Sequence, residues 1–387
     1  MLVYTLFILG VALLLYVDYA TNLKLVYIYK KVSINYLAIY GAFALIIVFG
    51  GFRYEIGYDY PKYLAGFLFD SELEKWEPFF NATVYFLREV NFGLDSQMLF
   101  LFYSAVTIFI LYKAICRLTP HYRVALLFYL MIPAFYLNSF SVIRQGIAMV
   151  ILLYGLPYLT VEYKLKKYLF IVFIAFMFHS ISIAIAMTYV LFERFFKQSY
   201  SGIVYDSILI GSLVMQLVGV ATLILTYAPG HYHMYIYHYA AVNPLKLLIV
   251  NGLFLFLMFQ KKQFVTTRLD KYLLNSMLVG TVIFNIFTNY ADVTRLAQYF
   301  LMSEIILVVR YIYSFHSQLK RIVVLGIFLL YYLFNFEYAL YRDINYPGSR
   351  PHFLVPYENY FLTDSKSDKE KYQQQWIQFY HNVGILK

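Results

Sequence analysis

Charged residues are scarce in this chain, and cysteine is almost absent. Asp, Glu, Lys and Arg together make up 13% of the 387 residues, whereas 62% are hydrophobic and 21% are aromatic. A water-soluble protein of this length has no core large enough to bury so much apolar surface. The single Cys116 excludes disulfides within the chain and leaves no cysteine-based metal site. The composition therefore predicts an all-α, polytopic membrane protein.

Motifs for nucleotide binding are also missing. The chain contains no P-loop, no dinucleotide-binding glycine fingerprint and no Asp-x-Asp pair, so a donor substrate need not be a nucleotide sugar. The net charge is +10, and the basic residues gather in short loops between apolar runs. This distribution is the positive-inside pattern of membrane proteins and argues against nucleic acid as a partner. Nothing in the sequence calls for a cofactor.

Apolar runs separated by charged loops predict about 11 or 12 membrane crossings in one domain over residues 1–341. Residues 2–15 lack a basic leading region and a cleavage site, so we interpret them as a retained first span with an external N-terminus. Residues 342–387 form an external tail. Within it, residues 366–385 are either an amphipathic helix on the membrane surface or a solvated tail.

The apolar run over residues 168–192 has basic residues at both ends, which a single crossing would place on opposite faces. Keeping both ends cytoplasmic favours a short helical hairpin or re-entrant element that turns near His179 and Ser180. A non-helical turn at membrane depth has to line a cavity. The alternative is a single kinked span, which would leave one of the basic loops on the external face.

Charged side chains gather on the external face that this topology predicts. Residues 50–60 follow the second span and carry Arg53, Glu55 and Asp59 among three glycines. The same face receives Arg144 with Gln145, then His179, and then Asp292 with Arg295. Ionisable groups at a membrane normally face a wet cavity or a partner, so we expect one shared polar pocket. The alternative is that Arg53 with Asp59, and Asp292 with Arg295, form local ion pairs that simply anchor helix ends.

These residue types suit chemistry on a lipid diphosphate. A guanidinium binds two phosphate oxygens with its planar fork, so Arg53, Arg144 and Arg295 are candidates to hold the diphosphate. An attacking sugar hydroxyl has to lose its proton to a nearby base. Asp59, Glu55 and His179 are the candidates for that base.

Histidines also gather in the loop over residues 228–243, at positions 231, 233 and 238. Their spacing resembles that of metal ligands, but the loop adds no carboxylate or cysteine and is rich in tyrosine. We expect no metal there and interpret the loop as a sugar-stacking or interface segment.

Four motifs resemble those of the EpsG family of polysaccharide polymerases, which is akin to the Wzy O-antigen polymerases. They are Gly51-Phe52-Arg53 with Gly57-Tyr58-Asp59-Tyr60 and Tyr63; Ile143-Arg144-Gln145-Gly146; Phe178-His179-Ser180; and Thr294-Arg295-Leu296 with Tyr299-Phe300. The resemblance implies catalytic roles for Arg53, Asp59, Arg144, His179 and Arg295. Substrate contacts are expected from Glu55, Tyr60, Tyr63, Gln145, Ser180 and Tyr299. Tyr58 departs from the small or hydroxyl residue of many members, which affects the local substrate fit.

The resemblance further implies a multi-pass enzyme of the bacterial inner membrane whose active site faces the periplasm. It would join polyprenyl-diphosphate-linked oligosaccharide repeat units by transferring the growing chain to a sugar hydroxyl of the incoming unit. Its partners would be these lipid-linked sugars, membrane lipids, and chain-length regulator and flippase proteins. The rival interpretations are a flippase or other transporter, and a ligase that joins finished polymer to a lipid core.

Overall fold

The computed structural model describes residues 1–29, 37–70, 76–90, 92–228, 233, 235–237, 239, 241–345 and 354–362. The predicted surface helix over residues 366–385, together with His231 and His238, lies outside these ranges. Within them the regular structure is helical, and β pairing is confined to two isolated bridges. The predicted all-α class is confirmed.

The chain forms two compact units. Unit 1 comprises the described residues of Met1–Phe109, Leu130–Ile147 and Phe334–Lys387, and unit 2 comprises those of Ile110–Tyr129 and Ala148–Leu333. The helices that begin in unit 1 are α1 (Leu2–Tyr29), α2 (Leu37–Gly51), α3 (Tyr60–Leu68), α5 (Pro78–Glu89), α6 (Gln97–Leu118), α8 (Tyr136–Ser139) and α9 (Ile143–Thr160). The predicted division into residues 1–341 and 342–387 stays a prediction.

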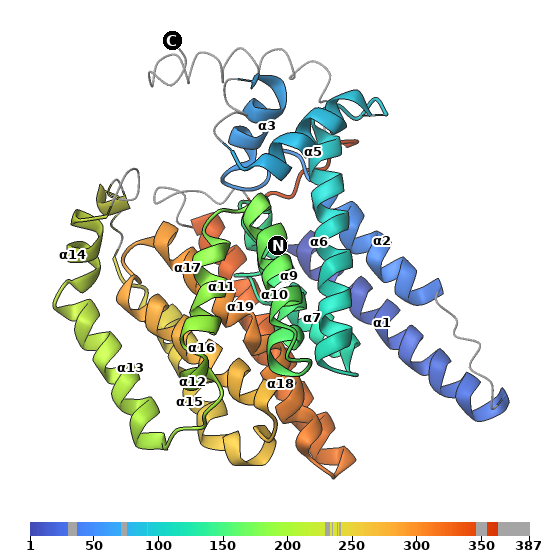
Figure 1. Ribbon diagram of the computed structural model, residues 1–387. Coiled ribbons are helices and arrows are strands. Elements are labelled where there is room, and N and C mark those ends of the chain that lie inside the picture. Colours follow the sequence, from blue (N-terminus) through green and yellow to red (C-terminus); the bar gives the residue numbers. More distant parts are fainter. Residues whose placement is uncertain are drawn as a thin grey trace. The chain divides into compact units, whose positions relative to one another are not determined.

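The remaining helices begin in unit 2. They are α7 (Tyr122–Met131), α10 (Leu165–Phe178), α11 (Ser182–Leu191), α12 (Glu193–Phe196), α13 (Gly202–Leu217), α14 (Val220–Thr226), α15 (Pro244–Phe264), α16 (Arg268–Ile286), α17 (Ala291–Leu301), α18 (Ser303–Ser314) and α19 (Gln318–Asn345). Helix α16 packs against α13, α15, α17 and α18 (Figure 1). It is therefore the central helix of this unit.

Among the residues that the structure describes, six helical segments are long and apolar enough to cross a membrane. They are Leu2–Thr21, Gln97–Leu118, Ile143–Thr160, Pro244–Phe264, Asp292–Ser314 and Gln318–Asn345. Helices α13 and α14 would add a seventh as one span bent by 64°. The predicted 11 or 12 crossings exceed this number because other apolar runs form helices of 10–17 residues, among them α2, α7 and α11.

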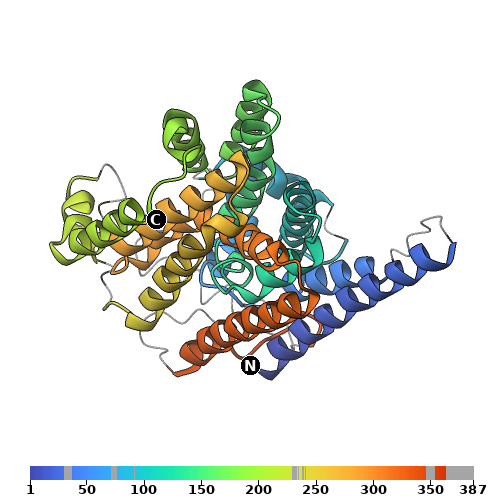
Figure 2. The same cartoon turned by 90° about the horizontal axis from the view of Figure 1, so that it is seen from below.

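Helix α1 shows why this fold needs a membrane. It lies side by side with α2 (Figures 1 and 2), and it buries Tyr4 and Val11 completely. Its other face leaves Leu2, Leu6, Leu9 and Leu13 between 57% and 72% exposed. Contiguous apolar surface of this kind is rare in soluble monomers and matches a lipid-facing stripe.

The helical hairpin predicted over residues 168–192 is present. Helix α10 ends at His179, which adopts an extended conformation, and the chain turns back into α11 (Figure 1). The Tyr168 hydroxyl donates to the carbonyl of Ala186 across the hairpin at 3.0 Å. The sequence thus predicted the position of this break correctly.

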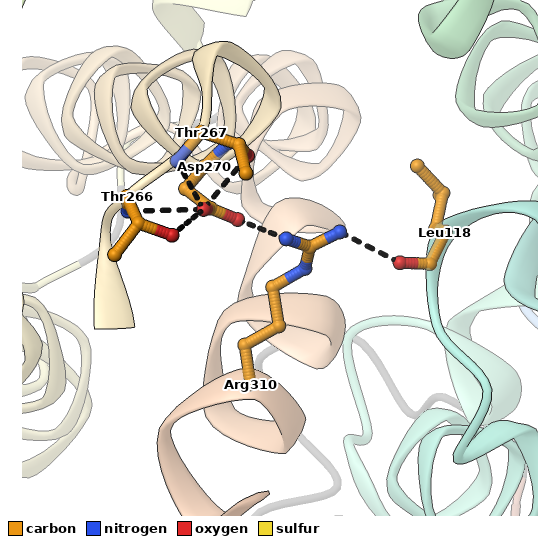
Figure 3. A network of polar contacts seen from close by, with 5 residues as sticks. All are labelled: Leu118, Thr266, Thr267, Asp270 and Arg310. Carbon is orange, nitrogen blue, oxygen red and sulfur yellow. Dashed lines mark hydrogen bonds and ion pairs between the residues drawn. The ribbon is translucent and has the colours of Figure 1, made fainter. Parts of the chain in front are cut away.

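A buried ion pair fixes the start of α16 inside unit 2 (Figure 3). Asp270 closes a capping box with Thr267 and also pairs with Arg310 of α18. The second terminal nitrogen of Arg310 donates to the Leu118 carbonyl at 2.9 Å. Asp270 is only 1% exposed whereas the Arg310 side chain is 25% exposed, so the carboxylate side of the pair is shielded from solvent. The contacts of Arg310 join three chain segments.

Candidate functional site

Residues 50–60, here named the arginine loop, follow α2 in unit 1 and require glycine at their closest contacts. A Cβ on Gly57 would lie 2.3 Å from the carbonyl oxygen of Phe140, and one on Gly51 would lie 2.8 Å from the Cα of Leu101. Gly57 also has a φ of +110°, which side chains rarely allow. The loop can therefore reach the Phe140 backbone only because glycine stands at position 57.

Arg53 is buried at the centre of the arginine loop. Its guanidinium donates to the carbonyl of Gly50, to that of Ile56 at 3.2 Å and to that of Phe140 at 3.1 Å. Its Cζ lies 4.8 Å from the ring centroid of Phe100 and 4.7 Å from that of Phe140. Burial lowers the pKa of Arg53 to about 10, so the group stays charged at neutral pH. The structure thus places Arg53 inside the scaffold of the loop.

Gln97, at the start of α6, holds the arginine loop from another side. Its amide donates to the carbonyls of Gly51 and Arg53 at 2.5 and 2.8 Å, and its oxygen accepts from the Tyr60 hydroxyl at 3.3 Å. Tyr60 stacks on Phe100 with the centroids 4.2 Å apart. Tyr60, which we predicted to contact substrate, is therefore 3% exposed and packed within the scaffold.

Residues 354–362, here named the strap, pair with the arginine loop. The Tyr54 amide donates to the Glu358 carbonyl at 3.0 Å, and the Tyr360 amide donates to the Phe52 carbonyl at 2.9 Å. The Tyr357 ring stacks on that of Phe49 at 4.2 Å. A segment that the sequence assigned to the tail therefore forms part of unit 1.

The carboxylates of the arginine loop lie nearer to its surface. Asp59 precedes α3 and pairs with Lys62 at 3.0 Å, and its side chain is 11% exposed whereas that of Lys62 is 61% exposed. Glu55 is half-buried and has a φ of +56°, which is strained for a residue with a Cβ. Asp59 thus keeps limited access to solvent, as a proton acceptor requires.

Arg144 begins α9 within an aromatic cluster. It pairs with Glu77, and its Cζ lies 5.0 Å from the ring centroid of Trp76, 5.7 Å from that of Phe80 and 6.0 Å from that of Tyr63. The side chains of Arg144 and Glu77 are 24% and 13% exposed. Unlike Arg53, Arg144 therefore combines a carboxylate partner with partial access to solvent.

Two predicted substrate contacts lie close to this cluster in the fold. Tyr63 is 3% exposed and packs edge to face on Trp76. Gln145 follows Arg144 in the first turn of α9 and is 5% exposed. Both side chains are buried, and their role in substrate contact stays a prediction.

Unit 2 contains a second group of predicted residues. The His179 Nδ1 atom lies 2.8 Å from the Tyr299 hydroxyl oxygen, and this bond fixes the imidazole plane. Tyr299 stands on α17 one turn after Arg295, which pairs with Asp292 at 3.3 Å. The hairpin turn thus contacts the same helix that carries Arg295, and Ser180 is exposed beside it.

The remaining predictions concern local pairs and a metal. Of the two local ion pairs, that of Asp292 with Arg295 is present. The ion pair found for Asp59 joins it to Lys62, and the Arg53 guanidinium donates to backbone carbonyls. Within the described residues no group of three metal-ligating side chains occurs, and His233 is exposed near Tyr237. One shared external pocket for all the predicted residues stays a prediction.

Sequence reasoning missed Gln97, Trp76 and Glu77 as members of these sites. A signal was available for Glu77, because Glu77-Pro78 is a typical start of a helix, with proline in its first turn. Gln97 is the polar residue directly before a long apolar run, which is also typical of a helix start. No local pattern indicated which segments these side chains would bind.

The structure is that of a polytopic, all-α membrane protein in which Arg144 and Arg295 lie near the starts of α9 and α17. The EpsG family model matches residues 36–359. The chain therefore belongs to the EpsG family, as the motifs indicated. Comparison with curated proteins gave no match, and comparison with solved structures gave none.

Proposed function

We propose that this protein is a membrane glycosyltransferase that polymerises polyprenyl-diphosphate-linked oligosaccharide repeat units. Membership of the EpsG family carries the proposal, because the matched region includes the arginine loop, Arg144, the His179 hairpin and Arg295. The enzyme would act at the periplasmic face of a bacterial inner membrane. It would take the lipid-linked sugars from a flippase and work with a chain-length regulator.

In the proposed reaction, a hydroxyl of the incoming unit attacks the anomeric carbon of the growing chain. A C–O bond forms there while the bond from that carbon to the carrier diphosphate breaks. Arg144 and Arg295 stabilise the negative charge that grows on the departing diphosphate. Asp59 or His179 accepts the hydroxyl proton. Tyr299 orients the imidazole through its 2.8 Å bond.

The structure modifies the role proposed for Arg53. Its guanidinium binds three backbone carbonyls between two rings. A side chain so occupied supports catalysis by holding the arginine loop, with Asp59 at its end, in position. We therefore propose Arg53 as a positioning residue and assign the diphosphate to Arg144 and Arg295.

A complementation experiment tests the polymerase assignment. A strain that lacks this gene should carry single repeat units, and Arg144→Ala should fail to restore long polymer whereas wild type succeeds. Lys320→Ala is the matched control, because Lys320 is an exposed cation outside both site groups. Full-length chains that stay on the carrier in the deletion strain would indicate a ligase. Repeat units retained on the cytoplasmic side would indicate a flippase.

A further inference from the structure

We infer that Glu77 occupies the anion site of Arg144 while no substrate is bound, and that an oxyanion on a sugar displaces it. This inference rests on the proposed function, because it assigns Arg144 to substrate binding. It adds a site residue, Glu77, and a binding wall, Trp76. The first observation is the ion pair itself, since a carboxylate presents to a guanidinium the same two oxygens as a phosphate does.

The geometry of the pair leaves part of the guanidinium unused. Glu77 accepts from a terminal nitrogen of Arg144, whereas the buried Nε atom has no acceptor among the described residues. A buried donor without a partner is unfavourable, because it has lost its hydrogen bonds to water. A free oxyanion can approach the guanidinium with two oxygens and reach Nε and a terminal nitrogen at once. The site is therefore better matched to a free oxyanion than to the tethered Glu77.

The Glu77 side chain can also bind the N-terminus of α5 once it leaves Arg144. It is the N-cap residue of α5, a helix of 12 residues, yet its side chain makes no capping bond to that helix. A carboxylate at a helix N-terminus is favoured by the helix dipole and by the free backbone N–H groups there. When an oxyanion takes Arg144, the released Glu77 can rotate to cap α5. That bond offsets part of the cost of breaking the ion pair.

The aromatic side chains around Arg144 favour a sugar as the group that carries the oxyanion. Trp76 and Phe80 lie 5.0 and 5.7 Å from the Arg144 guanidinium, so the cation is surrounded by aromatic faces. Sites for small organic ligands typically combine such apolar walls with one or two charged groups. The cluster matches a pyranose that stacks on an indole and carries a diphosphate or a carboxylate. Both are oxyanions, and separate probes distinguish them.

Direct binding to the purified full-length protein in nanodiscs tests this inference. The probes are inorganic pyrophosphate and glucuronate, each titrated calorimetrically. Glu77→Gln should bind one of them about tenfold more tightly than wild type, which corresponds to about 1.4 kcal/mol. A gain with pyrophosphate assigns the diphosphate, and a gain with glucuronate assigns an acidic sugar. Glu77→Asp, with its shorter reach to Arg144, should give a smaller gain and serves if the glutamine variant does not fold.

Asp70→Asn is the matched control. Asp70 lies in the same unit, pairs with Arg88 at 2.5 Å and is 64% exposed, so its substitution removes one negative charge without touching Arg144. Equal gains in the Asp70 and Glu77 variants, or dissociation constants within twofold of wild type for both probes, would overturn the inference. The two failures are distinguishable, because the polymer profile of Arg144→Ala tests the proposed function without any measurement on Glu77.

Discussion

Replacing Arg53 with lysine should destabilise unit 1 strongly, although the charge is retained. The guanidinium makes three bonds to backbone carbonyls, and a lysine ammonium at the same position can keep about one of them. Each hydrogen bond from a charged donor contributes about 1.5–3 kcal/mol. Loss of the flat contact with the two flanking rings adds about 1 kcal/mol. With two bonds lost, the expected total is at least about 4 kcal/mol.

Thermal unfolding of the purified protein in detergent measures this effect. For a unit of this size the apparent Tm should fall by about 10 °C. Trp76 lies in unit 1, so tryptophan fluorescence reports its unfolding. Arg144→Lys is the comparison: Arg144 is partly exposed, so its replacement should shift Tm far less while polymer is lost. An Arg53→Lys variant that melts like wild type but makes no polymer would refute the scaffold role and return Arg53 to substrate binding.

Three further predictions concern both units. Gly57→Ala should lower the stability by about 2 kcal/mol or more, measured by thermal unfolding, because the new Cβ meets a carbonyl oxygen at 2.3 Å in a conformation that alanine resists. Tyr299→Phe should slow repeat-unit addition by about tenfold in a reconstituted assay without altering Tm, because His179 loses the 2.8 Å bond that orients it. Asp270→Asn should lower the stability by about 3 kcal/mol, seen as reduced Tm and expression, because it leaves the partly buried Arg310 without its counter-charge.

The chain offers matched controls for these predictions. Gly93 has a φ of +74° with open space around it, so Gly93→Ala carries the backbone strain without the clash and should cost less than Gly57→Ala. Glu193 pairs with Arg268 but is 44% exposed, so Glu193→Gln should cost under about 1 kcal/mol. Equal losses of stability in Gly57→Ala and Gly93→Ala would contradict the first prediction. Equal losses in Asp270→Asn and Glu193→Gln would contradict the third. An unchanged rate for Tyr299→Phe would exclude the orienting role of Tyr299.

The sequence was informative wherever the signal was local. Hydropathy predicted the helical class, and the basic residues around positions 168–192 predicted the hairpin that turns at His179. The ion pair of Asp292 with Arg295 was a named alternative, since residues three apart on a helix are neighbours. Each of these features depends on residues close together in the chain.

Distant contacts could not be predicted in this way. The partner of Arg144 is 67 residues away, and Gln97 binds carbonyls 44 and 46 residues away. Such pairings depend on how helices pack, which hydropathy does not determine. The proposal for Arg53 changed in part for the same reason, because one of its acceptors is the carbonyl of Phe140, 87 residues away. The sequence therefore did not predict which candidate residues pack inside the fold and which stay partly exposed, and their roles in substrate binding stay a prediction.

The arginine loop can be completed only late in synthesis, because the strap that pairs with it lies near the end of the chain. The carbonyl of Leu354 accepts from the hydroxyl of Tyr4, 350 residues earlier, and Glu358 and Tyr360 pair with residues 54 and 52. A ribosome releases the loop into the membrane long before it makes these partners, and closing so long a loop is slow. The arginine loop therefore lacks its hydrogen bonds to the strap through most of translation. A chain interrupted before residue 354 would insert its membrane helices and still lack a finished arginine loop.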